Sequence, residues 1–196
     1  TRPKLNRANG VFTLTSLEQA QLGSLGITSP IHVVPNGIRP VAVASREAGL
    51  ALRARHGLGP AGRVVLFVGR ITSKKRIEDI IRAIGGLEAH LLIAGNPEAE
   101  PGYTAMLKAA AADAGCAHRV HWLGFMDEAA KATAYAAADC FVHASESEGM
   151  ALAILEAMSA GLPVVATQGC YMAEAARAGA LVECAPGPAA LTEALR

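Results

Sequence analysis

Short apolar runs alternate with longer segments of helical periodicity from residue 63 to the end of the chain. The runs are apolar at consecutive positions, which is typical of parallel strands covered by helices on both faces. The predicted strands are Arg63–Gly69, His90–Gly95, Arg119–Gly124, Cys140–Ala144, Pro163–Thr167 and Ala180–Glu183. The predicted helices are Ile77–Ile84, Tyr103–Ala114, Glu128–Ala138, Ala151–Ala160 and Met172–Ala178. This alternation predicts an α/β fold with a Rossmann-like, doubly wound, parallel six-stranded sheet.

The first part of the chain has a different pattern. Val11–Thr15 and Ile31–Pro35 are two short apolar runs, and a helical pattern over Leu17–Leu25 lies between them. A stretch rich in Pro and Gly follows. A segment of about 40 residues cannot bury a core of its own. We therefore expect residues 1–40 to be the terminal elements of a preceding domain, 41–62 a linker and 63–196 a separate domain.

Composition and charge exclude several classes of protein. The chain has 196 residues, is 52% hydrophobic and carries a net charge of +1, which favours a folded core and disfavours a general nucleic-acid binder. No apolar run reaches about 18 residues, so no transmembrane segment is predicted. The four cysteines form no CxxC pair, which indicates free thiols in a reducing cytoplasm. Because the chain does not begin with Met, we expect a fragment or a processed chain.

Basic residues follow the first predicted strand. Gly69 and Arg70 end this strand, and Lys75 comes five residues later. Ligands of open α/β sheets bind at the carboxyl ends of the strands, where an Arg fork and a Lys point charge suit a diphosphate. Several cations at a helix N-terminus oppose the helix dipole and so need a reason. A solvated basic loop is the alternative interpretation.

Two carboxylates flank the start of a predicted buried helix. Leu152–Met158 is apolar nearly all round and is interrupted only by Glu156, which needs a hydrogen-bond donor if it is buried. That donor is either a ligand hydroxyl or a structural Arg or backbone amide. Glu148 lies in the preceding loop, and Gly149 lets a ligand approach the helix N-terminal amides.

Glu148 and Glu156 form a Glu-x7-Glu pattern that closely resembles the signature of retaining GT-B glycosyltransferases of family 4, the glycosyl transferases group 1. The same resemblance extends over nearly the whole chain. It covers Phe67–Arg76, Leu91–Glu98, Val120–Phe125, Ala138–Gly149 and Glu148–Thr167, and residues 13–26 and 31–38 resemble the last elements of that family's N-terminal domain. The resemblance implies the C-terminal, donor-binding half of a GT-B fold.

The resemblance also implies roles for single residues. Arg70 and Lys75 would hold the donor diphosphate and Glu148 the hydroxyls of the transferred sugar, which makes these three the expected catalytic residues. Glu156 would bind the nucleotide ribose, and the backbone near Phe125 would meet the base. The remaining residues expected at the donor site are Gly69, Gly95, Gly149, Met150, Ala151 and Leu152. No Asp-x-Asp motif occurs, so we expect no metal and no other cofactor, with a UDP-, GDP- or ADP-sugar as donor substrate.

The implied activity is transfer of a hexosyl group to an acceptor hydroxyl with retention of configuration, in polysaccharide or glycolipid biosynthesis. The acceptor, a sugar or lipid-linked glycan, would bind the missing N-terminal domain. The whole protein would be cytoplasmic, either free or in peripheral contact with a membrane. The chain alone is expected to bind a donor nucleotide and to transfer no sugar. A non-catalytic nucleotide-sugar-binding or regulatory module is the alternative. A dinucleotide-dependent oxidoreductase is disfavoured, because a single Gly follows the first strand.

The chain departs from the family pattern without losing a charged site residue. Where the family usually has Gly-Gly, this chain has Cys170-Tyr171. Where the family usually has Gly after the phosphate-binding Lys, this chain has Arg76. The usual Pro before Ser145 is Ala144, and the aromatic residue common after Glu-Gly is Met150.

Other reactive side chains are predicted to be structural. We expect Cys170 to be a buried thiol, His121 a structural residue within a strand and His90 an exposed residue at a strand end. Trp122 is predicted to lie in the core. His143 ends the fourth predicted strand and is expected to line the pocket.

Overall fold

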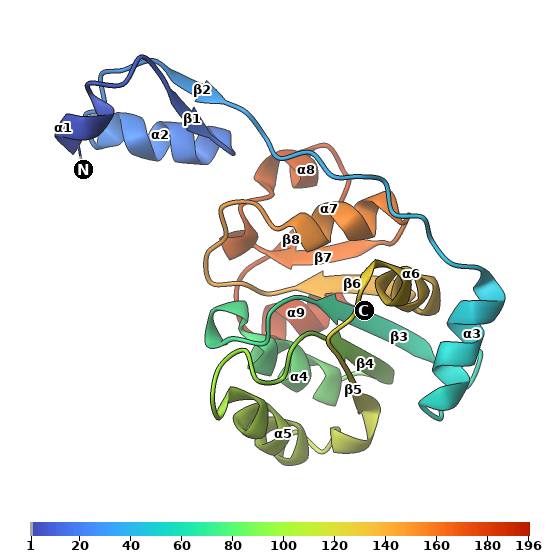
Figure 1. Cartoon of the computed structure of the whole chain (residues 1–196). Coiled ribbons are helices and arrows are strands. Elements are labelled where there is room, and N and C mark those ends of the chain that lie inside the picture. The colour runs from blue at the N-terminus through green and yellow to red at the C-terminus, as the bar shows by residue number, and fades with distance from the viewer. Residues whose placement is uncertain (1) are drawn as a thin grey trace.

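The computed structural model describes residues 2–196, which form two units (Figure 1). The N-terminal unit contains α1 (Arg2–Leu5), β1 (Val11–Thr13), α2 (Ser16–Ser24) and β2 (Ile31–Val33), and its two strands pair in parallel. An extended segment leads from β2 past α7 and α8 to the larger unit (Figure 1). The elements of the larger unit are α3 (Arg46–Arg55), β3 (Arg63–Val68), η1 (Ser73–Lys75), α4 (Ile77–Gly85), β4 (Ala89–Ala94), α5 (Tyr103–Asp113), η2 (Ala117–Arg119), β5 (Val120–Gly124), α6 (Glu128–Ala137), β6 (Cys140–His143), α7 (Leu152–Ser159), β7 (Val164–Thr167), η3 (Gln168–Cys170), α8 (Ala173–Arg177), β8 (Val182–Cys184) and α9 (Pro188–Ala194).

The larger unit is built on the predicted sheet of six parallel strands, in the order β5-β4-β3-β6-β7-β8. Leu66 of β3 pairs with Leu92 of β4 on one side and with Phe141 of β6 on the other. The strand order therefore reverses between β3 and β6, and open α/β sheets bind ligands in the crevice at such a reversal. The loop after β3 carries Arg70 and Lys75, the loop after β6 carries Glu148, and the two loops meet at this crevice.

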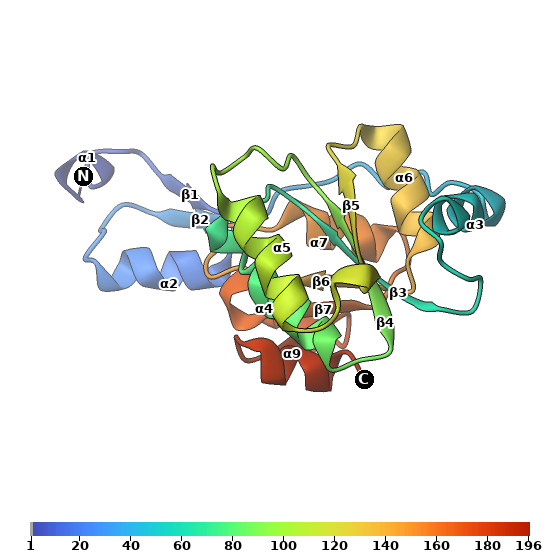
Figure 2. The same ribbon diagram turned by 90° about the horizontal axis from the view of Figure 1, so that it is seen from below.

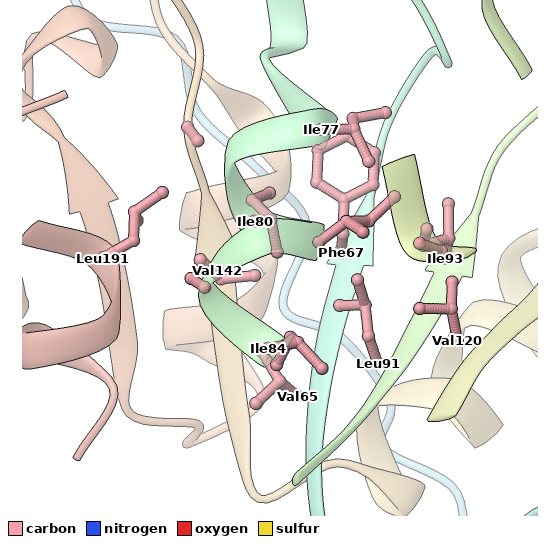
Figure 3. Packing of buried hydrophobic residues seen from close by; sticks show 14 of the residues in the cluster. Val65, Phe67, Ile77, Ile80, Ile84, Leu91, Ile93, Val120, Val142 and Leu191 are labelled. Carbon is pink, nitrogen blue, oxygen red and sulfur yellow. The ribbon is translucent and has the colours of Figure 1, made fainter. Parts of the chain in front are cut away.

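Helices cover both faces of the sheet. Val65 and Phe67 of β3 pack in one apolar cluster with isoleucines of α4, as Figure 3 shows. Val64 and Leu66 belong to the opposite cluster, with side chains from α3, α6 and α7. In Figure 2, α4 and α9 lie side by side on the first face, in agreement with their extensive contact. Alternate residues of one strand thus reach both clusters, which explains why the strands are apolar at consecutive positions.

The segment predicted as a linker, 41–62, contains the helix α3, which the sequence analysis missed. Its buried residues are Gly49, Leu52 and Arg53, so it has no apolar stripe that periodicity could reveal. The Arg53 guanidinium donates to the carbonyl of Ala137 and to Asp139, both at 2.7 Å. A buried Arg and a close helix contact therefore hold α3 against α6 of the α/β unit.

Gly49 provides a direct test of this contact. A Cβ atom at Gly49 would lie 2.4 Å from the carbonyl oxygen of Ala136 in α6. We expect Gly49→Ala to lower the free energy of unfolding by about 1–3 kcal/mol, because the helices would have to separate. Gly23→Ala is the control, since nothing lies within 4 Å of that position in α2. Chemical denaturation that gives the same free energy for wild type and Gly49→Ala would contradict the packing of α3.

Three histidines meet at the edge of the sheet. Nδ1 of His90 lies 3.2 Å from Nε2 of His121, and the ring of His56 lies edge-on to His121 with 5.6 Å between centroids. Burial, and then the neighbouring charges of His90 and His56, lower the pKa of His121 to about 4. His90, predicted to be exposed, is half-buried, and burial lowers its pKa as well.

These histidines should make folding sensitive to acid. Because the pKa of His121 is about 4 in the folded protein and about 6.5 in an unfolded chain, the unfolded state binds more protons between these values. The contribution of His121 to stability is complete above about pH 6.5 and is lost as the pH falls toward about 4. Guanidinium unfolding across this range should show a shallower loss for His121→Gln than for wild type. Identical slopes would contradict the expectation.

Candidate functional site

Three loops are tied together at the carboxyl edge of the sheet. The amide of Glu146, after β6, donates to the carbonyl of Lys74, after β3, at 2.9 Å. The amide of Glu148 donates to the carbonyl of Gly169, after β7, at 3.0 Å. A Cβ atom at Gly169 would lie 2.2 Å from the carbonyl oxygen of Ser145, so only glycine lets these loops approach so closely.

Glu148 and Lys75 form an ion pair where these loops meet. The Lys75 ammonium contacts Oε1 of Glu148, and the two side chains are only 14% and 15% exposed. Ser145 Oγ donates to the same oxygen, and Nε2 of His143 lies 3.3 Å from it. Although burial raises the pKa of Glu148, the hydrogen bonds from His143, Lys75 and Ser145 and the charge of Lys75 lower it to about 2. Glu148 is therefore a carboxylate at neutral pH.

His143 lies beside this carboxylate and inside the core. Its side chain is 2% exposed. Its ring stacks against Phe67 at 5.4 Å and 17°, and against Phe141 at 6.1 Å and 12°. Burial lowers the pKa of His143, an effect that Glu148 opposes and the charge of Lys75 reinforces. Sequence reasoning placed His143 near the site but did not foresee its contact with Glu148.

Arg70 follows β3 and is exposed. Within residues 2–196 its guanidinium has no ion-pair or hydrogen-bond partner, so its charge is available to a ligand. The neighbouring Gly69 leaves little room for a side chain, since a Cβ atom there would lie 3.0 Å from the Phe67 ring. At Gly95, after β4, a Cβ atom would lie 2.1 Å from the carbonyl oxygen of Gly69. This backbone contact alone requires a glycine at Gly95.

The loops at the crevice contain two strained residues. Arg76 and Tyr171 are the only residues other than glycine with positive φ between residues 2 and 196, at 49° and 54°. The Arg76 guanidinium is held by the buried Asp79, at 3.0 Å. Next to Tyr171, Cys170 is fully buried, as predicted, and this burial raises the pKa of its thiol to about 11.

Glu156 is satisfied by side chains of the neighbouring helix. The Lys131 ammonium of α6 lies 3.0 Å from both carboxylate oxygens, and the Tyr135 hydroxyl donates to Oε2 at 2.9 Å. The donors are thus a Lys and a Tyr, neither of which the sequence analysis named. Lys131 and Tyr135 are four residues apart in the predicted helix, which shows that they share a face. Nothing in the sequence shows that this face meets Glu156.

A cavity of about 750 Å³ adjoins Glu156. Its walls are the segment 37–44, the side of α6 that carries Lys131, and the start of α7 with Leu152. The segment is fastened to α6 by a hydrogen bond of 3.4 Å from the amide of Ala44 to the carbonyl of Ala132. Cavities of this size accommodate small ligands. Phe125 is 80% exposed and is not among the residues that form these walls, so its contact with a base stays a prediction.

The N-terminus of α7 faces the loop of Glu148. Ala151 is its N-cap, and no side chain caps the first amides of this helix. The predicted amides of Met150, Ala151 and Leu152 are therefore placed at an uncapped helix end, where an anion is favoured. The N-terminal unit reaches the same region, since a Cβ atom at Gly149 would lie 3.4 Å from the Leu14 side chain, and Ser16 Oγ donates to the Glu174 carboxylate of α8.

Among residues 2–196, no three His, Cys, Asp or Glu side chains are grouped so that they could hold a metal ion. Over the same residues, no helix combines the length and the apolar character needed to cross a membrane.

Residues 51–196 match the family model described as glycosyl transferases group 1. The chain belongs to this family. A relative, the D-inositol 3-phosphate glycosyltransferase of Mycolicibacterium gilvum, is 35% identical over 166 residues. That match covers 83% of this chain and 37% of the relative, so the chain spans little more than a third of the relative's length.

Solved structures share the fold of this chain over nearly its whole length. Sucrose-phosphate synthase from Thermosynechococcus elongatus has a TM-score of 0.86 at 23% identity, covering 99% of this chain and 50% of that protein. HepE from Anabaena, in complex with UDP-glucose, has a TM-score of 0.82 at 23% identity, covering 96% of this chain and 53% of that protein. The predicted α/β architecture is thereby confirmed as that of GT-B glycosyltransferases.

The pair of Lys131 and Glu156 can be tested apart from any ligand. We expect Lys131→Met to lower the free energy of unfolding by about 1–3 kcal/mol, because it leaves the half-buried carboxylate with Tyr135 alone. In a double-mutant cycle with Glu156→Gln, the coupling energy should be about 0.5–3 kcal/mol. Lys74→Met, at an exposed position, is the control. Additive effects of the two substitutions would contradict a stabilising pair.

Proposed function

We propose that this chain is the sugar-donor-binding part of a glycosyltransferase that moves a hexosyl group from a nucleoside-diphosphate sugar to an acceptor hydroxyl with retention of configuration. The observation that carries the proposal is the position of Lys75, Arg70 and Glu148 at the reversal of strand order between β3 and β6. Here an exposed Arg after β3 and the ion pair of Lys75 with Glu148 lie at the strand ends that form the crevice in which α/β sheets bind ligands.

In the proposed complex, Arg70 and Lys75 bind the diphosphate. Arg70 supports this role because its guanidinium is exposed and has no partner within residues 2–196. Lys75 has three N–H donors and uses one on Glu148, which leaves donors for phosphate oxygens. The amides of Met150, Ala151 and Leu152 at the uncapped start of α7 supply further donors.

Glu148 accepts hydrogen bonds from hydroxyls of the transferred sugar, and Glu156 binds the ribose. Support for the first role comes from the ionised state of Glu148 beside the diphosphate ligand Lys75. Support for the second comes from the cavity along α6 and α7, since Glu156 is part of its wall. The base lies near Phe125, and Gly69, Gly95 and Gly149 keep the surrounding loops close to the ligand.

During transfer, negative charge builds on the departing diphosphate. Arg70 and Lys75 stabilise this charge electrostatically, and no metal or other cofactor takes part. Loss of one such group typically costs about 2.7–4 kcal/mol of transition-state stabilisation. The acceptor, a sugar or lipid-linked glycan of polysaccharide or glycolipid assembly, binds in a preceding domain of the whole protein.

The basic loop provides the test of this proposal. We expect Arg70→Ala and Lys75→Ala each to weaken binding of a nucleoside diphosphate by about tenfold to a hundredfold, the effect of one charge-assisted hydrogen bond. Binding of the matching nucleoside monophosphate should change much less, because the distal phosphate carries the extra charge. Isothermal titration calorimetry with UDP, GDP and ADP and their monophosphates measures both.

Lys74→Ala is the matched control, because its side chain is exposed and only its backbone carbonyl holds the loop. It should leave all affinities nearly unchanged. Equal losses of diphosphate affinity in the three variants would mean that a diffuse positive field attracts the ligand, and would contradict specific contacts from Arg70 and Lys75. Failure of the wild-type chain to bind any of the three diphosphates would overturn the proposed function.

A further inference from the structure

Three hydrogen-bond donors converge on a single oxygen of Glu148. Lys75 Nζ, Ser145 Oγ and His143 Nε2 all contact Oε1. Within residues 2–196, Oε2 accepts no hydrogen bond. A carboxylate has about four acceptor sites, two on each oxygen. One oxygen is therefore used to hold the side chain, and the other keeps its full capacity to accept hydrogen bonds from a ligand.

The contacts of His143 define its tautomer. Nε2 faces the Glu148 carboxylate at 3.3 Å, whereas Nδ1 is buried and has no partner among residues 2–196. A neutral imidazole has one N–H, and it serves as a donor only on Nε2. A second proton would bury an N–H without an acceptor and place a second cation close to Lys75. His143 therefore acts as a neutral ring that donates from Nε2.

His143 is also the least mobile of the three donors. Its ring stacks against Phe67 and Phe141, and a Cβ atom at Gly69 would lie 3.7 Å from its Cε1 edge. The Ser145 hydroxyl can rotate, and the ammonium of Lys75 sits on a flexible stem and is needed for the diphosphate. Packing therefore fixes the direction of the Nε2–H bond of His143, whereas it does not fix the direction of the Ser145 hydroxyl or the Lys75 ammonium.

An apolar side chain at this position would serve the core better than a histidine. It would pack against the two phenylalanine rings without burying the unpartnered Nδ1. The imidazole must therefore supply something that an apolar side chain lacks, and its one polar contact is with Glu148.

We infer that His143 is a positioning residue: its Nε2–H fixes Oε1 of Glu148 and so presents Oε2 to a hydroxyl of the transferred sugar. This inference rests on the proposed function, in which Glu148 binds that sugar. His143 does not touch the ligand. Its effect is specific for the sugar and does not extend to the nucleoside diphosphate.

The experiment compares a nucleotide sugar with its nucleoside diphosphate. Affinities for UDP and UDP-glucose, GDP and GDP-mannose, and ADP and ADP-glucose are measured by calorimetry on wild type, and the tightest pair is used. The readout is the ratio of the two association constants, sugar nucleotide over diphosphate. Glu148→Gln and His143→Phe should each lower this ratio about tenfold, equivalent to about 1.4 kcal/mol. His143→Gln, which restores an N–H donor, should keep the ratio within about threefold of wild type.

Each other outcome has a distinct meaning. If Glu148→Gln leaves the ratio unchanged, the proposed sugar contact is wrong, and the inference is wrong with it. If Glu148→Gln lowers the ratio and His143→Phe does not, only the inference is overturned. A purely structural role would weaken both ligands equally and leave the ratio unchanged. Circular dichroism and thermal unfolding check that each variant folds. If His143→Phe does not fold, His143→Leu takes its place. If neither of these two variants folds, His143 serves the core alone and the inference is overturned.

Discussion

The sheet is buried on both faces, and this constraint decides where polar chemistry can occur. Residues Val64–Val68 contact apolar clusters on alternate sides, so a polar side chain in the middle of such a strand would have no partner. Buried polar side chains do occur where strands end, as at His143, Ser145 and Thr167. The carboxyl edge, and within it the reversal between β3 and β6, is the place where backbone and side chains are released from packing.

At that edge each carboxylate of the candidate site forms an ion pair with a lysine. The Glu148 side chain is largely buried, and the hydrogen bonds from His143, Lys75 and Ser145 keep the pKa of its carboxyl low in spite of that burial. The same ammonium serves the proposed diphosphate, so Lys75 links the phosphate end of the ligand to its sugar end. Glu156, beside the cavity, is held in a similar way, because the Lys131 ammonium balances its charge and the Tyr135 hydroxyl donates a hydrogen bond to it. Each carboxylate is thus fixed before a ligand arrives, which reduces the ordering that binding would require.

Periodicity predicted the six strands and the helices between them, because burial on both faces leaves a plain mark in the sequence. It missed α3, whose buried face is a glycine, a leucine and an arginine that finds its acceptors only in the folded chain. At the site, residue type and spacing indicated Arg70, Lys75, Glu148 and Glu156. The contact of Lys131 with Glu156 and the contact of His143 with Glu148 depend on how separate elements pack, and no local sequence pattern encodes that packing.

The two strained residues show that the fold fixes loop conformation more strongly than residue type does. Arg76 and Tyr171 have positive φ at positions where the family pattern has glycine, at the ends of η1 and η3 beside the crevice. A left-handed conformation costs a residue with a side chain about 1–2 kcal/mol. Arg76 offsets part of this cost through its ion pair with the buried Asp79. The loops keep the conformation that glycine would adopt freely, and the hydrogen bonds that join Lys74 to Glu146 and Gly169 to Glu148 lie within two residues of the strained positions.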